Sequence, residues 1–136
     1  MTDQQPMRSR HLSQVIRRPP ATVYAFAAEP ANLTLWAAGL VQAEVRRDGA
    51  DLLADTPGGQ IRIRFAAPNE LGVLDHDVTT PDGVQTFNPF RVLPHPEGSE
   101  VLFALRQLAL SDTEFDRDAG MVQSDLDRLR DLLEGA

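Results

Sequence analysis

The stretch SDTEFDRDAGMVQSDLDRLRDLLEGA, residues 111–136, carries the clearest pattern in the chain. Ser111 and Glu114 have the spacing of a capping box, and Leu110 and Phe115 can form a hydrophobic staple around it. Apolar residues then recur at intervals of four and three, while charged residues occupy the opposite face. The apolar set is Phe115, Ala119, Val122, Leu126, Leu129 and Leu133. The pattern predicts an amphipathic helix of about six turns, which Gly135 ends.

In the sequence before this helix, apolar residues recur at every second position. Apolar and polar residues alternate, most clearly in QIRIRFAA (60–67), and turn signals such as Asp48-Gly49 and Pro81-Asp82-Gly83 separate the segments. We therefore expect an antiparallel sheet of about seven strands. The segments are 10–17, 40–47, 50–56, 60–67, 72–80, 84–93 and 101–110.

Prolines mark two short helices after the first strand. Pro19 and Pro20 begin the helix 21–28, and Pro30 ends it and can begin the helix 31–37. Because a long helix with one apolar stripe must cover a sheet face, the fold class is α+β, a curved sheet wrapped around the C-terminal helix. Residues 1–9 are expected to form a flexible tail and residues 10–136 a single domain. The choice between Met1 and Met7 as the start stays open.

Composition excludes several functional classes. The 136 residues are 42% hydrophobic and 24% charged, which is typical of a globular chain. Thirteen basic against twenty acidic residues give a net charge of -7, which argues against nucleic-acid binding. All basic residues are arginine, so lysine chemistry is excluded, and no cysteine is present to act as a nucleophile or zinc ligand. No signal peptide or membrane span is recognisable, and we expect a cytoplasmic protein.

The stretch RRPPATVYAFAAEPANLTLWAAGL (17–40) resembles the opening of the SRPBCC superfamily of START-like domains, polyketide cyclases and plant-allergen-type lipid binders. The order of elements over residues 10–134 is similar too. GVLDHDVTTPDG (72–83) and residues 111–134 resemble a bacterial, polyketide cyclase- or dehydratase-like branch of it. The resemblance implies the helix-grip fold, with a cavity between the sheet and the C-terminal helix. It implies no single reaction, because members include carriers, sensors, hydrolase activators and cyclases.

The three-residue loop 81–83 sets the register of two strands. It places Val78 opposite Thr86 and His76 opposite Asn88, so that alternate residues of both strands face inward. The inward rows predict a mainly apolar cavity with a few polar groups, as small-molecule sites have. The expected ligand-binding residues are Trp36, Ile61, Ile63, Phe65, Leu74, His76, Val78, Asn88, Phe90, Phe103, Leu105, Gln107, Met121 and Val122.

Two of these residues keep alternative interpretations. His76 is a core histidine satisfied by Asn88 and a backbone group, a ligand-binding group, or an acid–base catalyst. Trp36 is either a core plug or a lid over the cavity mouth.

Charged residues near the cavity are interpreted by alternation. Asp75 and Asp77 should face away from His76, which argues against a metal site. Arg62 and Arg64 are expected on a solvated strand face, with a carboxylate-binding rim as the alternative. Asp118 and Asp125 flank the helix stripe, near the expected cavity mouth. Neither a metal nor a cofactor is expected.

The expected function is binding of a small, predominantly hydrophobic molecule, lipid-like or polyketide-like, in the cavity. One alternative is a polyketide cyclase, aromatase or dehydratase that uses His76 as acid or base, with Asn88 or Gln107 holding a carbonyl oxygen. Another is a stress-related interaction module with no ligand. Whether the protein is an enzyme, and whether it is a monomer or a homodimer, stays open at this point.

Overall fold

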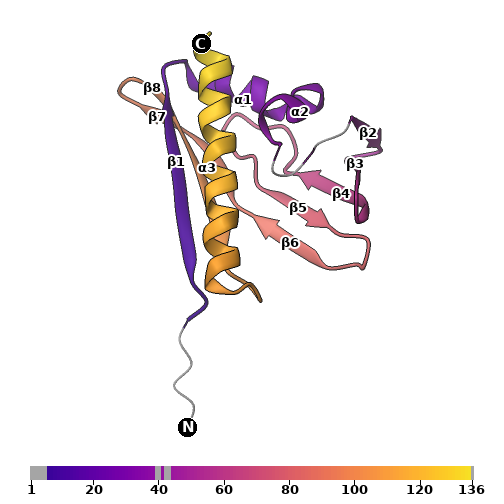
Figure 1. Cartoon of the computed structure of the whole chain (residues 1–136). Helices are drawn as coiled ribbons and strands as arrows, with labels where there is room; N and C mark the ends of the chain where they lie inside the picture. The colour runs from indigo at the N-terminus through magenta and orange to yellow at the C-terminus, as the bar shows by residue number, and fades with distance from the viewer. Residues whose placement is uncertain (1–5, 39–40, 42–43, 136) are drawn as a thin grey trace.

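The structure is a computed structural model that describes residues 6–38, 41 and 44–135. Within these residues one long helix lies along a set of antiparallel strands, and short helices follow the first strand (Figure 1). The elements are β1 (Ser9–Ile16), α1 (Pro20–Ala28), the 3₁₀ turn η1 (Pro30–Asn32), α2 (Leu33–Trp36), β2 (Val45–Asp48), β3 (Asp51–Thr56), β4 (Gly59–Phe65), β5 (His76–Thr79), β6 (Gln85–Asn88), β7 (Phe90–His95), β8 (Gly98–Arg106) and α3 (Asp112–Glu134). The expected helix-grip fold is confirmed, with eight strands instead of seven.

The helix α3 forms as the sequence predicts. The Ser111 hydroxyl accepts a hydrogen bond from the Glu114 amide at 3.1 Å, and the Glu114 carboxylate accepts one from the Ser111 amide at 2.9 Å. Gly135, with φ of 75°, ends the helix in the left-handed conformation. Five of the six stripe residues are buried, and each contributes roughly 1.5–3 kcal/mol if it is large and aliphatic or aromatic. The sixth, Val122, is half-buried and lines the cavity described below.

The strands form two hydrogen-bonded groups, in the orders β1-β8-β7 and β2-β3-β4-β5-β6. Residues before β5 join the two groups, because Val73 bridges to Arg91 and the Leu74 amide donates to the Phe90 carbonyl at 2.8 Å. The predicted register is confirmed: Val78 pairs with Thr86 and His76 with Asn88.

The segment 84–93, predicted as one strand, is divided at Pro89. Its first part, β6, pairs with β5, and its second part, β7, pairs with β8. The Ala104 amide donates to the Pro89 carbonyl at 3.0 Å, but proline has no N–H to return the bond. In the described part of the chain, Leu105 and Arg106 of β8 then pair with β1 and not with β6. The two strands therefore separate beyond Pro89.

Other boundaries differ from the predicted ones by a few residues. The strand expected over 101–110 ends at Arg106, where the chain turns and Leu108 adopts a positive φ of 54°. The first strand begins at Ser9, and Arg8 already pairs with Asp112 at 3.1 Å, so the ordered chain starts inside the segment expected to be a tail. Residues 1–5 of that tail, and most of the chain between 39 and 43, lie outside the described residues.

Candidate functional site

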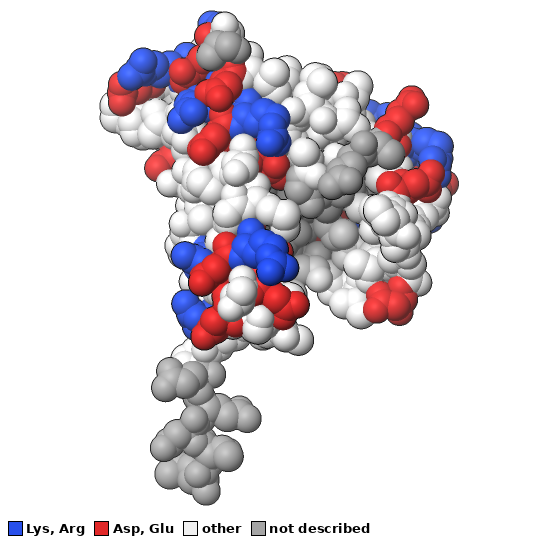
Figure 2. Space-filling model, viewed as in Figure 1, with Lys and Arg blue, Asp and Glu red and all other residues white. Residues whose placement is uncertain are grey.

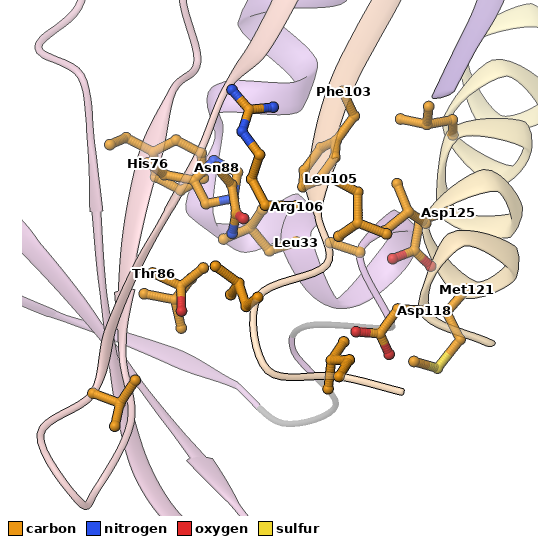
Figure 3. A pocket seen from close by; sticks show the side chains of 18 of the residues that line it. Leu33, His76, Thr86, Asn88, Phe103, Leu105, Arg106, Asp118, Met121 and Asp125 are labelled. Atoms are coloured by element: carbon orange, nitrogen blue, oxygen red, sulfur yellow. The ribbon is translucent and has the colours of Figure 1, made fainter. Parts of the chain in front are cut away.

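A cavity of about 480 Å³ lies between the sheet and α3, at the place where β6 and β8 separate. One wall comes from β5 and β6, with His76, Thr86 and Asn88, and the opposite wall from α3, with Asp118, Met121 and Asp125 (Figure 3). Figure 2 shows charged side chains of both signs over the solvent face of α3. Most of the residues that line the cavity are apolar.

Nine of the fourteen residues expected at the site line this cavity. They are Trp36, Phe65, His76, Val78, Asn88, Phe103, Leu105, Met121 and Val122. They come from α2, four strands and α3, so the fold brings together residues that are far apart in the chain.

Five expected residues lie elsewhere. Ile61, Ile63, Leu74 and Phe90 are buried at 6% exposure or less and belong to the core but not to the cavity lining. Alternation along a strand predicts that a side chain is buried, and it does not predict whether a cavity adjoins it. Gln107 lies beyond the end of β8, where its side-chain amide donates to the Leu110 carbonyl and to the Asp112 carboxylate. It braces the turn into α3, and the expectation that it faces the cavity is wrong.

Several lining residues were not expected. Leu33 stands one helical turn before Trp36 on α2, and that spacing is a signal that the sequence offers. Leu108, Ala109 and Leu110 belong to the turn before α3, and their place at the cavity mouth depends on where β8 ends. The sequence has no signal for that end point.

His76 is the most constrained polar group in the cavity. Its side chain is 5% exposed and lies among aromatic rings, with ring centroids 4.9 Å from Phe65 and 6.0 Å from Phe103. Its Nδ1 lies 2.9 Å from the Leu74 carbonyl oxygen, so Nδ1 carries the proton and donates it. Burial lowers the pKa of His76 below its ordinary value, which keeps the ring neutral.

The second ring nitrogen of His76 has no hydrogen-bond partner among the described residues. With the proton on Nδ1, Nε2 presents a lone pair and can only accept. Asn88 is the cross-strand neighbour of His76 but makes no hydrogen bond to it, and the Asn88 amide has no partner in the described part of the chain. The interpretation of His76 as a histidine satisfied by Asn88 is therefore wrong on this point, while its backbone partner is confirmed.

Trp36 is buried and forms part of the cavity wall. Its ring is 6% exposed and packs on Phe90 with centroids 5.7 Å apart. The Arg128 side chain donates to the Trp36 carbonyl at 3.0 Å and also pairs with Asp125, which fixes the end of α2 against α3. This position agrees with a core plug better than with a lid. The indole Nε1 has no partner among the described residues.

The charges that line the cavity are two carboxylates and one guanidinium. Burial, followed by the charge of Glu114, raises the pKa of Asp118. Asp125 is paired with Arg128 at 3.0 Å, and Arg106 extends from β8 away from α3 (Figure 3). The lining thus carries charges of both signs.

The other charged residues singled out by the sequence serve the sheet. Asp75 accepts hydrogen bonds from the Phe90 amide and the Arg91 guanidinium. Arg62 and Arg64 both pair with the buried Asp51 on the neighbouring strand, so their carboxylate partner is internal. Within the described residues no three His, Asp or Glu side chains are grouped so that they could hold a metal ion. The described helices include none that combines the length and the apolar character of a membrane span.

No family model and no curated protein matches the chain in sequence. Solved structures do match. A protein from Chromobacterium violaceum has a TM-score of 0.67 at 18% identity, over 95% of this chain and 99% of that one. DynU16, a protein in the dynemicin biosynthetic locus, has a TM-score of 0.73 at 13% identity, over 95% of this chain and 48% of its own. Ara h 8.0201 has a TM-score of 0.65 at 13% identity, over 96% of this chain and 99% of its own.

These identities are too low to transfer a function, and what they establish is the fold. The chain has the helix-grip fold, with its cavity between the sheet and the long C-terminal helix.

Proposed function

We propose that this protein binds a small, predominantly hydrophobic molecule in the cavity between β5, β6, β8 and α3. The observation that carries the proposal is the cavity itself, about 480 Å³, lined by aromatic and aliphatic side chains and by one buried imidazole whose Nε2 has no hydrogen-bond partner among the described residues. Small-molecule sites typically measure about 300–1,000 Å³ and have mainly apolar walls with a few polar groups.

The energetics of the fold support this proposal. Apolar side chains that face a void lack the packing contacts of a filled core, so an open cavity lowers stability. Trp36, Phe65 and Phe103 face such a space. A ligand that fills it would restore those contacts. The interaction-module alternative required an interior filled by side chains, and the cavity argues against it.

The proposal is tested by titration with the neutral fluorophore N-phenyl-1-naphthylamine, whose emission rises in apolar surroundings. Saturable binding is expected. Leu105→Trp, which places a larger side chain on the cavity wall, should weaken binding at least about tenfold. Leu132→Trp is the matched control, because Leu132 lies on α3 outside the cavity and is 40% exposed. Absence of saturable binding, or equal affinities of both variants, contradicts the proposal.

A second candidate function is a cyclase or dehydratase reaction on a polyketide-like substrate. One observation favours it: burial lowers the pKa of His76, and its Nε2, which has no partner in the described part of the chain, can accept a proton as a general base does. Asn88 remains available to hold a carbonyl oxygen, whereas Gln107 does not. Loss of turnover in His76→Gln, with probe binding retained, would support this reaction over simple binding.

A further inference from the structure

His76, on the sheet wall of the cavity, has one ring nitrogen, Nε2, that can accept a hydrogen bond and cannot donate one. The Leu74 carbonyl fixes the proton of His76 on Nδ1, 2.9 Å away, and the side chain is 5% exposed. Nε2 of this ring has no hydrogen-bond partner among the described residues, and His76 lines the cavity. A ligand that supplies a donor to Nε2 forms a hydrogen bond there, whereas a ligand that presents only lone pairs faces another lone pair.

Asn88 stands beside this acceptor and completes a two-point site. His76 and Asn88 are directly paired across β5 and β6, so their side chains leave the same face with Cβ atoms roughly 4.5–5.5 Å apart. Both lie on the sheet wall in Figure 3. The Asn88 amide has no partner among the described residues and can turn its NH₂ toward the cavity. A hydroxyl group matches this pair, because it can donate to Nε2 and accept from the amide at once.

The groups around His76 disfavour an anionic ligand. Asp118 stands on the helix wall opposite this pair, while Asp125 on the same wall is paired with Arg128. Among the described residues that line the cavity, Arg106 is the only one with a permanent positive charge, and it extends away from α3. A carboxylate placed at His76 would face the lone pair of Nε2 and would lose its hydration.

We infer, building on the proposed function, that the ligands of this cavity are neutral, apolar molecules with a hydroxyl group, which donates to Nε2 of His76 and accepts from Asn88. Carboxylates of the same shape, fatty acids included, are discriminated against. The inference concerns the class of ligand and holds for a carrier and for an enzyme.

The test compares three probes with one skeleton: 1-pyrenemethanol, 1-methylpyrene and 1-pyrenecarboxylate, titrated by fluorescence at pH 7.5. The alcohol should bind about fivefold tighter than the methyl compound, which corresponds to one net hydrogen bond. It should also bind at least about tenfold tighter than the carboxylate. In His76→Phe the ratio of alcohol to methyl affinity should fall to about one.

Two further variants keep the test decisive. Asn88→Leu should reduce the same ratio, and it carries the test if His76→Phe fails to give a cooperative thermal transition. Thr79→Val is the matched control, since Thr79 also lies on β5 but outside the cavity, and its ratio should equal that of the wild type.

The outcomes separate the inference from the proposed function. If all three probes bind equally, or if the carboxylate binds best, the inference is overturned and the proposed function stands. A preference for the carboxylate that disappears in Arg106→Gln would assign that preference to Arg106. If none of the probes binds saturably, the proposed function fails and the inference fails with it.

Discussion

Acidification from pH 7.5 to 5.5 should destabilise the folded protein through His76. Burial, the largest cause, lowers its pKa below 6.5, while the Leu74 carbonyl and the charges of Asp75 and Asp77 raise it by less. Well above pH 6.5 the ring is neutral in both states, and its contribution to the pH dependence is small. Below pH 6.5 the unfolded chain binds a proton that the folded chain does not bind, and stability falls until the pH reaches the folded-state pKa. If the folded ring stays neutral throughout, the loss is about 1.4 kcal/mol over this range.

The assay is urea unfolding at pH 7.5, 6.5 and 5.5, followed by the fluorescence of Trp36, the only tryptophan. The free energy of unfolding of His76→Leu should fall less than that of the wild type between pH 7.5 and 5.5, by up to about 1.4 kcal/mol. Protonation of carboxylates whose pKa is lowered in the folded state, such as Asp75, reduces the stability of the protein only below about pH 3.8. The raised pKa of Asp118 acts in the opposite direction and is common to both proteins.

His11→Gln removes an exposed imidazole and should follow the wild type over the whole pH range. If the curves of the wild type and His76→Leu run parallel from pH 7.5 to 5.5, then His76 does not resist protonation in the folded state. The assignment of Nε2 as a pure acceptor would then be wrong as well.

Three other predictions concern single elements. Ser111→Ala should cost about 1 kcal/mol in urea unfolding through loss of the capping box, while Ser124→Ala, exposed within α3, should change stability by less than about 0.5 kcal/mol. Leu108→Gly should stabilise by about 0.5–1 kcal/mol by relieving the positive φ, and Leu108→Val should destabilise, both measured as the shift in Tm. Pro89→Ala supplies the missing N–H opposite Ala104. It should therefore slow hydrogen exchange of the amides around residues 89 and 104, and it should weaken binding of N-phenyl-1-naphthylamine. Unchanged exchange and affinity would contradict the role given to Pro89.

Local patterns predicted much of the fold. The stripe and capping box of α3 are short-range signals, and the loop 81–83 fixes a register that depends only on turn length. Strand ends were less well predicted, because they depend on which neighbour is present. Alternation continues through Pro89 and through Gln107, although pairing changes at the first and β8 has already ended before the second.

The candidate site was predictable only as a set of inward-facing residues. Alternation places Leu74 and Val78 on the same inward face, and both are buried. Of these two, only Val78 lines the cavity. A sequence pattern predicts that a side chain is buried. It does not report whether another side chain or an empty space lies opposite, because that depends on elements distant in the sequence. The backbone partner of His76 was predicted correctly, but its predicted hydrogen bond to Asn88 does not occur among the described residues, since cross-strand pairing fixes proximity and not a hydrogen bond.

The cavity follows from the point at which two strands stop pairing. On one side of Pro89 the ladder between β7 and β8 is continuous, and Phe90 packs on Phe103 with centroids 5.8 Å apart. On the other side β8 stays with β1 while β6 stays with β5, so their walls diverge. There β6 offers Thr86 and Asn88, which are too small to fill the widened space. The same alternating sequence therefore packs into the core on the β7 side of Pro89 and lines a cavity on the β6 side.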